Sequence, residues 1–340
     1  MLLKIRFLKI LIVYVLPIIL LGYLFSQIGV ERVILSFKKL DISWYLLAFL
    51  IFVLTQLFNS QRIKISASSF KITLFKLFKI TNLYTFYNSV LPSRTGELSL
   101  VFLLKKYSGT HPSRGFMTLA TIRFLDYFLN FSIYLVLLLI YWRVMPQILQ
   151  SFMIIFVPVV MVALSLGICI LVFKNRFIRL LLTLLSETKI ARISFCNKLV
   201  SFFKVVLNDF QEIRSGNLYI LLFIWTAIIV FLRWTTLYFL VRSTGFNITI
   251  ANLLFLSIAQ LLSRAIQSVG NFGTQEAGYT AAFMSFGVPK EEAITLSISV
   301  HLLELTLVLA LAGLSALTLK ANKTEGSGES YRGASKTNEL

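Results

Sequence analysis

The residues best suited to chemistry lie in a short polar motif and in the apolar stretch that follows it. The motif, residues 89–97, reads SVLPSRTGE and carries Arg94 and Glu97. The apolar stretch carries Arg123 and Asp126, whose spacing puts them on one face of a helix. A guanidinium group binds phosphate or carboxylate through paired hydrogen bonds. These residue types at this spacing indicate either phosphate binding or an internal ion pair.

A second copy of this arrangement lies near the C-terminal end of the sequence. Residues 268–276 read SVGNFGTQE and share Ser, Val, Thr and Glu with the first motif at matching positions. Ionisable residues around both motifs keep the same order and nearly the same offset: Arg62 and Arg242, Glu97 and Glu276, Arg123 and His301, and Asp126 and Glu304. This repetition predicts two related halves.

The composition excludes a soluble globular domain. Hydrophobic residues make up 57% of the chain and charged residues 14%, and the mean hydropathy is +0.83. Apolar runs of about 18–25 residues recur, and each is long enough to cross a bilayer core of about 30 Å. We expect an all-α polytopic membrane protein with about six transmembrane helices, over residues 10–25, 42–59, 113–142, 152–173, 218–241 and 292–319.

The net charge of +19 does not indicate nucleic-acid binding, because the Lys and Arg residues lie in short segments between apolar runs. Most of the 33 Lys and Arg residues fall in segments on one side of the predicted spans. This asymmetry is typical of a multi-pass protein of the cell membrane with its N-terminus in the cytoplasm. It also predicts affinity for anionic headgroups. We expect a basic cytoplasmic loop over 174–217 and a disordered tail over 320–340.

Two regions, residues 74–107 and 250–287, each consist of two short apolar pieces with a Pro or Gly break between them. Such breaks are tolerated at membrane depth only inside protein or beside water. We therefore expect two re-entrant helical hairpins. Three crossings in each half, 1–151 and 152–319, give the halves opposite orientations, so the hairpins are opposed and the repeat is inverted. Fully spanning hairpins would instead give ten spans and parallel halves.

These motifs resemble those of the lysylphosphatidylglycerol synthase transmembrane-region family, flippase-like proteins also grouped as uncharacterised protein family 0104. The first family motif falls on Asn88, Pro92, Arg94, Gly96 and Glu97, the basic and acidic pair on Arg123 and Asp126, and the second motif on Gly270, Gly273 and Glu276. The sequence departs from the pattern at Asn271 and Phe272, which replace a proline and a glycine. It also departs at His301, where an arginine is expected, and at Ser99 and Leu100, where a basic residue is expected.

The resemblance implies movement of a charged lipid between membrane leaflets. That lipid is an aminoacylated phospholipid in the best-known member, and the resemblance extends to polyprenyl-linked glycolipids in others. The best-known member also carries a soluble aminoacyl-transferase domain, for which this sequence shows no counterpart. Among the partners we expect are membrane lipids with anionic headgroups and enzymes of envelope or glycolipid synthesis.

The candidate site residues have three predicted roles. An ionisable side chain inside a span costs about 2.5–3.5 kcal/mol on insertion scales, so it commonly marks a functional site. We assign headgroup or phosphate binding to Arg94, Glu97, Arg123, Asp126, Arg264 and Glu276. We assign gating or proton coupling to His301 and Glu304, because histidine titrates near neutral pH. We assign hairpin geometry to Asn88, Pro92, Gly96, Gly270 and Gly273.

Each assignment has a structural alternative. Arg123 and Asp126 could form an ion pair that only holds the helices together. Glu97 and Glu276 could cap the helices that follow their glycines. An intramembrane histidine such as His301 could be a hydrogen-bonded packing residue. The sequence alone leaves these alternatives open.

Three classes of function fit the sequence: a lipid transporter, an integral-membrane transferase and a non-transporting scaffold. We favour the transporter, because paired intramembrane charges suit a polar lipid headgroup and a scaffold does not need them. The sequence does not favour the transferase, because it has no Asp-x-Asp pair, no Gly-rich nucleotide loop and no nucleophile with an adjacent base. We expect no metal and no cofactor.

Overall fold

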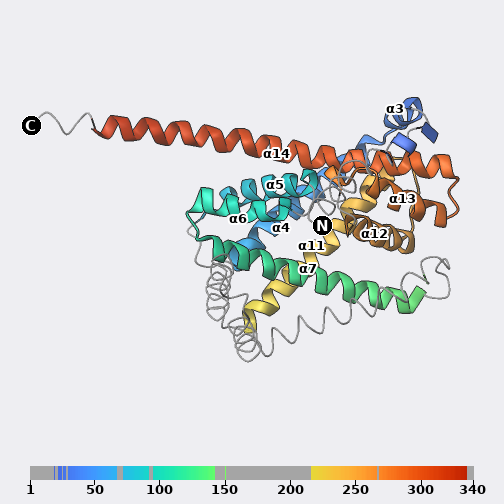
Figure 1. The fold of residues 1–340 in the computed structure, drawn as a ribbon, viewed down its shortest axis with the longest axis horizontal. Coiled ribbons are helices and arrows are strands. Elements are labelled where there is room, and N and C mark those ends of the chain that lie inside the picture. The colour runs from blue at the N-terminus through green and yellow to red at the C-terminus, as the bar shows by residue number, and fades with distance from the viewer. Residues whose placement is uncertain are drawn as a thin grey trace, which may run out of the picture. The chain divides into compact units, whose positions relative to one another are not determined.

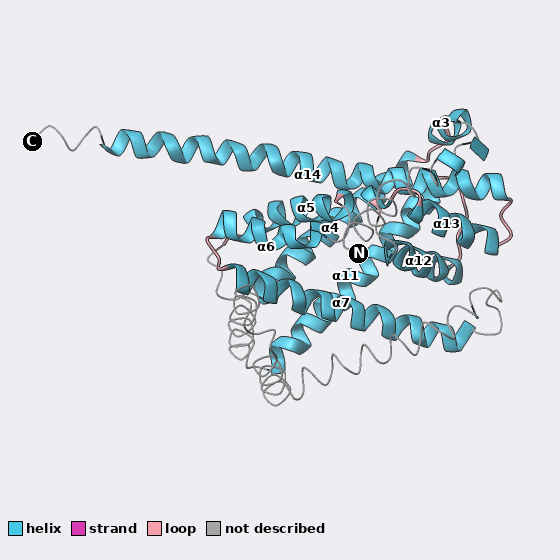
Figure 2. Ribbon diagram, viewed as in Figure 1, coloured by secondary structure: helices cyan, strands magenta, loops and turns pink. Residues whose placement is uncertain are grey.

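The computed structural model describes residues 30–66, 72–91, 95–141, 216–265 and 268–334, with a few positions between 19 and 27 and residue 150. Over these residues it is helical and contains no strand (Figure 2). The described helices include α3 (Val30–Lys38), α4 (Ile42–Ser66), α5 (Leu74–Val90), α6 (Thr95–Ser108), α7 (Pro112–Tyr141), α11 (Gly216–Ser243), α12 (Ile250–Ala265), η4 (Val269–Asn271), α13 (Thr274–Ser285) and α14 (Lys290–Ala334).

Four of the described helices are long and apolar enough to cross a membrane. The segments are Ile42–Ser66, Pro112–Val136, Leu218–Ser243 and Lys290–Leu319, in α4, α7, α11 and α14. They correspond to four of the six predicted spans. The predicted span 152–173 and nearly all of the span 10–25 lie outside the described residues, as does almost all of the predicted loop 174–217.

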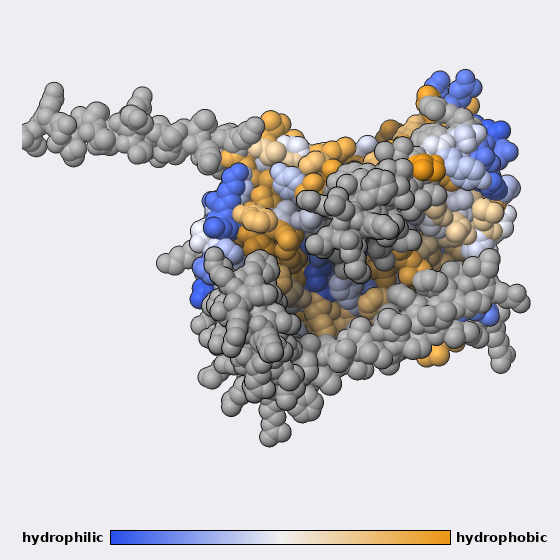
Figure 3. Space-filling view, viewed as in Figure 1, coloured by the Kyte–Doolittle hydropathy of each residue, from blue (hydrophilic) through white to orange (hydrophobic). Residues whose placement is uncertain are grey.

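The long helices expose large apolar side chains. Leu50 of α4, Leu139 of α7, Phe231 of α11 and Leu317 of α14 are each more than half exposed. Apolar residues likewise cover much of the described surface in Figure 3. Such a surface is unfavourable in water but is solvated by lipid tails. The chain is therefore a multi-pass membrane protein.

Two helices continue beyond their predicted ends. The predicted second span ends at residue 59, whereas α4 continues to Ser66 and includes Arg62. The predicted last span ends at 319, whereas α14 continues to Ala334 and includes most of the segment expected to be a disordered tail. Extending an existing helix costs far less free energy than nucleating a new one, so polar residues can prolong an apolar helix.

The chain forms two compact units. Unit 1 comprises Met1–Gln61, Ile72–Leu103 and Leu232–Leu340, and unit 2 comprises Arg62–Lys71 and Leu104–Phe231. Each unit is therefore assembled from separate parts of the sequence, and neither coincides with a predicted half. The division into the halves 1–151 and 152–319 stays a prediction.

Unit 1 is built around the first part of α14. Helices α13, α5 and α3 contact α14, and α12 contacts α13 (Figure 1). The core of this unit contains Tyr279 and Phe283 of α13 and Val300 and Leu307 of α14, all fully buried or nearly so. These aromatic and branched side chains hold the helix that carries the second polar motif against α14.

Both predicted hairpin regions contain two helices with a break between them. Helix α5 ends at Val90 and α6 begins at Thr95. In the second region η4 separates α12 from α13, and its Gly270 has a φ of 64°. Gly273 follows with a φ of 78°, a backbone conformation that glycine adopts without steric cost. The breaks are confirmed, and the re-entrant path of each hairpin stays a prediction.

Gly96 allows α6 to begin very close to the end of α5. A Cβ atom at this position would lie 2.5 Å from Asn88 Cα and 2.7 Å from the carbonyl carbon of Tyr87, and closer still to the Tyr87 oxygen. All three atoms belong to the backbone, so no side-chain rotation relieves the clash. The glycine therefore permits this close approach of the two helices, and its role in hairpin geometry stays a prediction.

We predict that Gly96→Ala lowers the free energy of unfolding by about 1–3 kcal/mol, because the added methyl group overpacks a backbone contact. Gly313→Ala is the matched control, since nothing lies within 4 Å of its added Cβ. That control should be neutral or stabilising by up to about 1 kcal/mol, because alanine favours helix. Denaturant titration in detergent micelles measures both. Equal stability of the two variants would contradict the close contact.

Candidate functional site

The first polar centre lies in unit 2 and consists of Arg62, Arg123, Asp126 and Thr226, which we call the Asp126 cluster. Arg62 donates from Nη1 to Asp126 Oδ1 at 2.5 Å and from Nη2 to Oδ2 at 3.4 Å. Its Nη1 also donates to the Thr226 hydroxyl at 3.1 Å. Arg62 of α4 therefore bonds to one residue of α7 and one of α11.

The side chains of Arg62, Asp126 and Thr226 are removed from solvent. Arg62 is 2% exposed, Asp126 is 4% exposed and Thr226 is fully buried. A buried charge is tolerated only when a partner and hydrogen bonds compensate for lost hydration. The paired hydrogen bonds between the guanidinium and the carboxylate meet this requirement. The pair consequently ties α4 to α7 within unit 2.

Arg123 is a second, more distant cation at the same carboxylate. Its Nη1 lies 3.9 Å from Asp126 Oδ2, within ion-pair range but too far for a hydrogen bond. The Arg123 side chain is 20% exposed, against 2% for that of Arg62. The predicted contact between Arg123 and Asp126 is present, but Asp126 pairs more closely with Arg62.

Arg62 was not among the predicted site residues. It follows the apolar run of α4 and is close to Lys64 in sequence, so it resembles a cytoplasmic basic residue. The one signal for it is its offset from Arg242 in the repeat. Arg242 itself is engaged differently, bonded to Asn247 Oδ1 and 5.0 Å from the ring centroid of Trp44.

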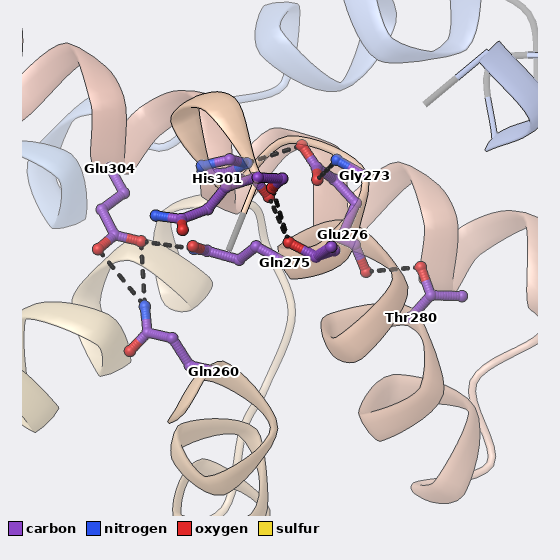
Figure 4. Close-up of polar contacts among 11 residues, drawn as sticks. Gln260, Gly273, Gln275, Glu276, Thr280, His301 and Glu304 are labelled. Carbon is purple, nitrogen blue, oxygen red and sulfur yellow. Dashed lines mark hydrogen bonds and ion pairs between the residues drawn. The ribbon is translucent and has the colours of Figure 1, made fainter. Parts of the chain in front are cut away.

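The second polar centre lies in unit 1 and begins at the N-terminus of α13 (Figure 4). Glu276 Oε2 accepts a 2.7 Å hydrogen bond from the backbone N–H of Gly273. The other oxygen, Oε1, lies 2.7 Å from His301 Nδ1 on α14. Glu276 is 1% exposed and His301 is 2% exposed. Glu276 thus caps α13 and joins it to α14. This geometry matches the structural alternative, in which Glu276 caps the helix that follows its glycine.

One turn further along α14, Glu304 is held by two carboxamides. Gln275 Nε2 of α13 donates to Glu304 Oε2 at 2.9 Å. Gln260 Nε2 of α12 donates to the same oxygen at 3.1 Å and to Oε1 at 3.4 Å. Three helices thus meet at this carboxylate (Figure 4). His301 and Glu304 lie on one face of α14, as expected. The two glutamines were not predicted, because an uncharged amide in an apolar helix gives no distinctive signal.

The remaining predicted site residues divide as follows. Asn88, Gly96, Glu97, Gly270 and Gly273 belong to unit 1, and Glu97 is half-buried in the first turn of α6. Pro92 and Arg94 lie outside the described residues, and so does the side chain of Arg264. Asp126 is thus brought together with Arg123, and Glu276 with His301. Convergence of both groups on a shared pocket stays a prediction.

In the described part of the chain, no group of three or more His, Cys, Asp or Glu residues is arranged to hold a metal ion. Both centres instead combine one or two carboxylates with guanidinium, imidazole or carboxamide donors. Such combinations of side chains bind charged and polar groups through hydrogen bonds.

A model of a known protein family matches most of the chain. The model described as lysylphosphatidylglycerol synthase TM region matches residues 6–312. The chain belongs to this family. No curated protein and no solved structure matches it. The lysylphosphatidylglycerol synthase TM region match includes both polar centres, three of the four described spans and most of the fourth, which makes this an integral membrane protein tied to lipid metabolism or transport.

We predict that Arg62→Leu and Asp126→Leu each lower the free energy of unfolding by about 3–5 kcal/mol, because each leaves a buried charge without its partner. The double variant should lose far less than the sum, since the Arg62 and Asp126 charges are then removed together. Denaturant titration of the purified protein in micelles gives all three values.

The exposed pair Arg32–Glu291 is the matched control, with side chains 54% and 60% exposed. The same double-substitution cycle there should give a coupling of about 0–1 kcal/mol. Additive losses at Arg62 and Asp126 would show that the two side chains are not paired.

Proposed function

We propose that this protein moves a phosphate-bearing lipid between the leaflets of the cell membrane. The observation that carries the proposal is the Asp126 cluster, in which two arginines share one carboxylate among helices of membrane-spanning length. Guanidinium groups bind phosphate through charge-assisted hydrogen bonds, and ionisable side chains within spans commonly mark a functional site. The family assignment to lipid metabolism or transport supports a lipid phosphate as that anion.

Within this proposal, Arg123 is the residue that binds the headgroup phosphate. It is the more exposed of the two arginines and the more distant from Asp126. A phosphate can therefore replace the 3.9 Å interaction with a charge-assisted hydrogen bond to the guanidinium. Arg62 keeps its shorter bonds to Asp126 and holds that carboxylate in position. The lipid tails remain in the bilayer beside the exposed apolar side chains.

The proposal extends to residues beyond this cluster. Arg94, Glu97, Arg264 and Glu276 are proposed headgroup ligands, and His301 and Glu304 act in gating or proton coupling. The proposed frame is an inverted repeat of six spans and two opposed re-entrant hairpins, with the N-terminus in the cytoplasm. The substrate class is an aminoacylated phospholipid or a polyprenyl-linked glycolipid.

We predict that Arg123→Gln slows lipid movement at least about tenfold, because it removes the charge that binds phosphate. Arg123→Lys should keep part of the rate, and Arg32→Gln, at an exposed ion pair, should keep all of it. The measurement uses proteoliposomes with fluorescently labelled phosphatidylglycerol, and in parallel a labelled polyprenyl phosphate, quenched from outside by dithionite. A wild-type rate in a correctly folded Arg123→Gln protein would remove this role.

The inverted topology has its own test. Single cysteines replace Ser93 and Phe272 in a protein whose Cys169 and Cys196 are changed to serine. A membrane-impermeant maleimide should label the two positions from opposite faces of the membrane. Labelling of both from one face would instead establish parallel halves.

A further inference from the structure

The side chain of Gln275 has an unsatisfied oxygen inside unit 1. The residue is 1% exposed and its Nε2 donates to Glu304. Its Oε1 is buried and accepts no hydrogen bond from any described residue. Buried polar atoms in folded proteins are nearly always satisfied by protein, by water or by a ligand. The unsatisfied atom is an acceptor, so it calls for a hydrogen-bond donor or a cation.

The surroundings of this oxygen favour positive charge. Glu304 supplies a carboxylate, held in place by Gln260, which donates to both of its oxygens. The Gln275 amide donates to this carboxylate, so the negative charge lies close to the unsatisfied oxygen.

An anion is the less suitable occupant. The N-terminus of α13 would attract one, but the carboxylate of Glu276 already accepts from Gly273 there. Oxygen ligands are the set preferred by hard cations. One carboxylate with neutral oxygens carries too little negative charge for tight binding of a divalent ion, which leaves a monovalent cation.

We propose that Gln275 Oε1 and the Glu304 carboxylate form a binding site for a monovalent cation, with Gln260 as a positioning residue. The cation is a free alkali-metal ion or the ammonium group of a lipid. Both present the same charge to the same oxygens, and the experiment separates them. Cation binding at this site does not depend on the proposed function. Only the use of this cation to drive lipid movement rests on the proposed function.

The test measures the melting temperature of the purified full chain in micelles at constant ionic strength. Sodium or potassium chloride should raise it by a few degrees relative to N-methyl-D-glucamine chloride, because a ligand that binds only the folded state stabilises it. Gln275→Met removes the oxygen at nearly constant volume and should abolish the shift. Gln56→Met is the control, since Gln56 is also buried but bonds to Thr85.

A second experiment, which tests the lipid as the source of the cation, measures the melting temperature in vesicles of phosphatidylglycerol with or without phosphatidylethanolamine. A stabilisation that requires the ammonium lipid and Gln275, with no response to salt, identifies the lipid as the source. Should Gln275→Met fail to fold, saturable binding of radioactive sodium to the wild type, competed by potassium but not by N-methyl-D-glucamine, supports the site.

Two results overturn the inference: a wild type that responds to neither alkali ions nor the ammonium lipid, or a folded Gln275→Met protein that responds as the wild type does. Neither result bears on the proposed binding of phosphate by Arg123, which is a residue of unit 2. A failed transport assay with an intact cation response would likewise leave this site standing.

Discussion

The structure depends on the requirement that charges placed among apolar helices be paired. Arg62 and Asp126 meet this requirement with hydrogen bonds across two helices, and a third helix adds the Thr226 hydroxyl. A pair of this kind contributes little net stability but is costly to break. It therefore holds together the parts of α4, α7 and α11 that lie in unit 2.

The two polar centres use different chemistry for their carboxylates. Asp126 is surrounded by permanently charged guanidinium groups, which bind anions. Glu276 and Glu304 are satisfied by a backbone N–H, an imidazole and two carboxamides. The repeated sequence motif thus leads to two environments with opposite electrostatic character.

Much of the local structure could be predicted from the sequence. The end of α5 at Val90 and the interruption at Gly270 and Gly273 follow from proline, glycine and the end of an apolar run, and the shared face of Arg123 and Asp126 follows from helical spacing. The role of Arg62 could not be predicted, because the end of an apolar run does not locate the end of a helix. Gln260 and Gln275 were missed because their importance arises only from a tertiary contact with Glu304.

The spacing of His301 and Glu304 on α14 has a mechanical consequence. Both side chains reach α13, one through Glu276 and the other through Gln275. Sliding α14 by a single residue would displace both side chains by about 1.5 Å relative to their partners on α13. Both links are therefore strained together, so movement of α14 along α13 is opposed at two points one turn apart.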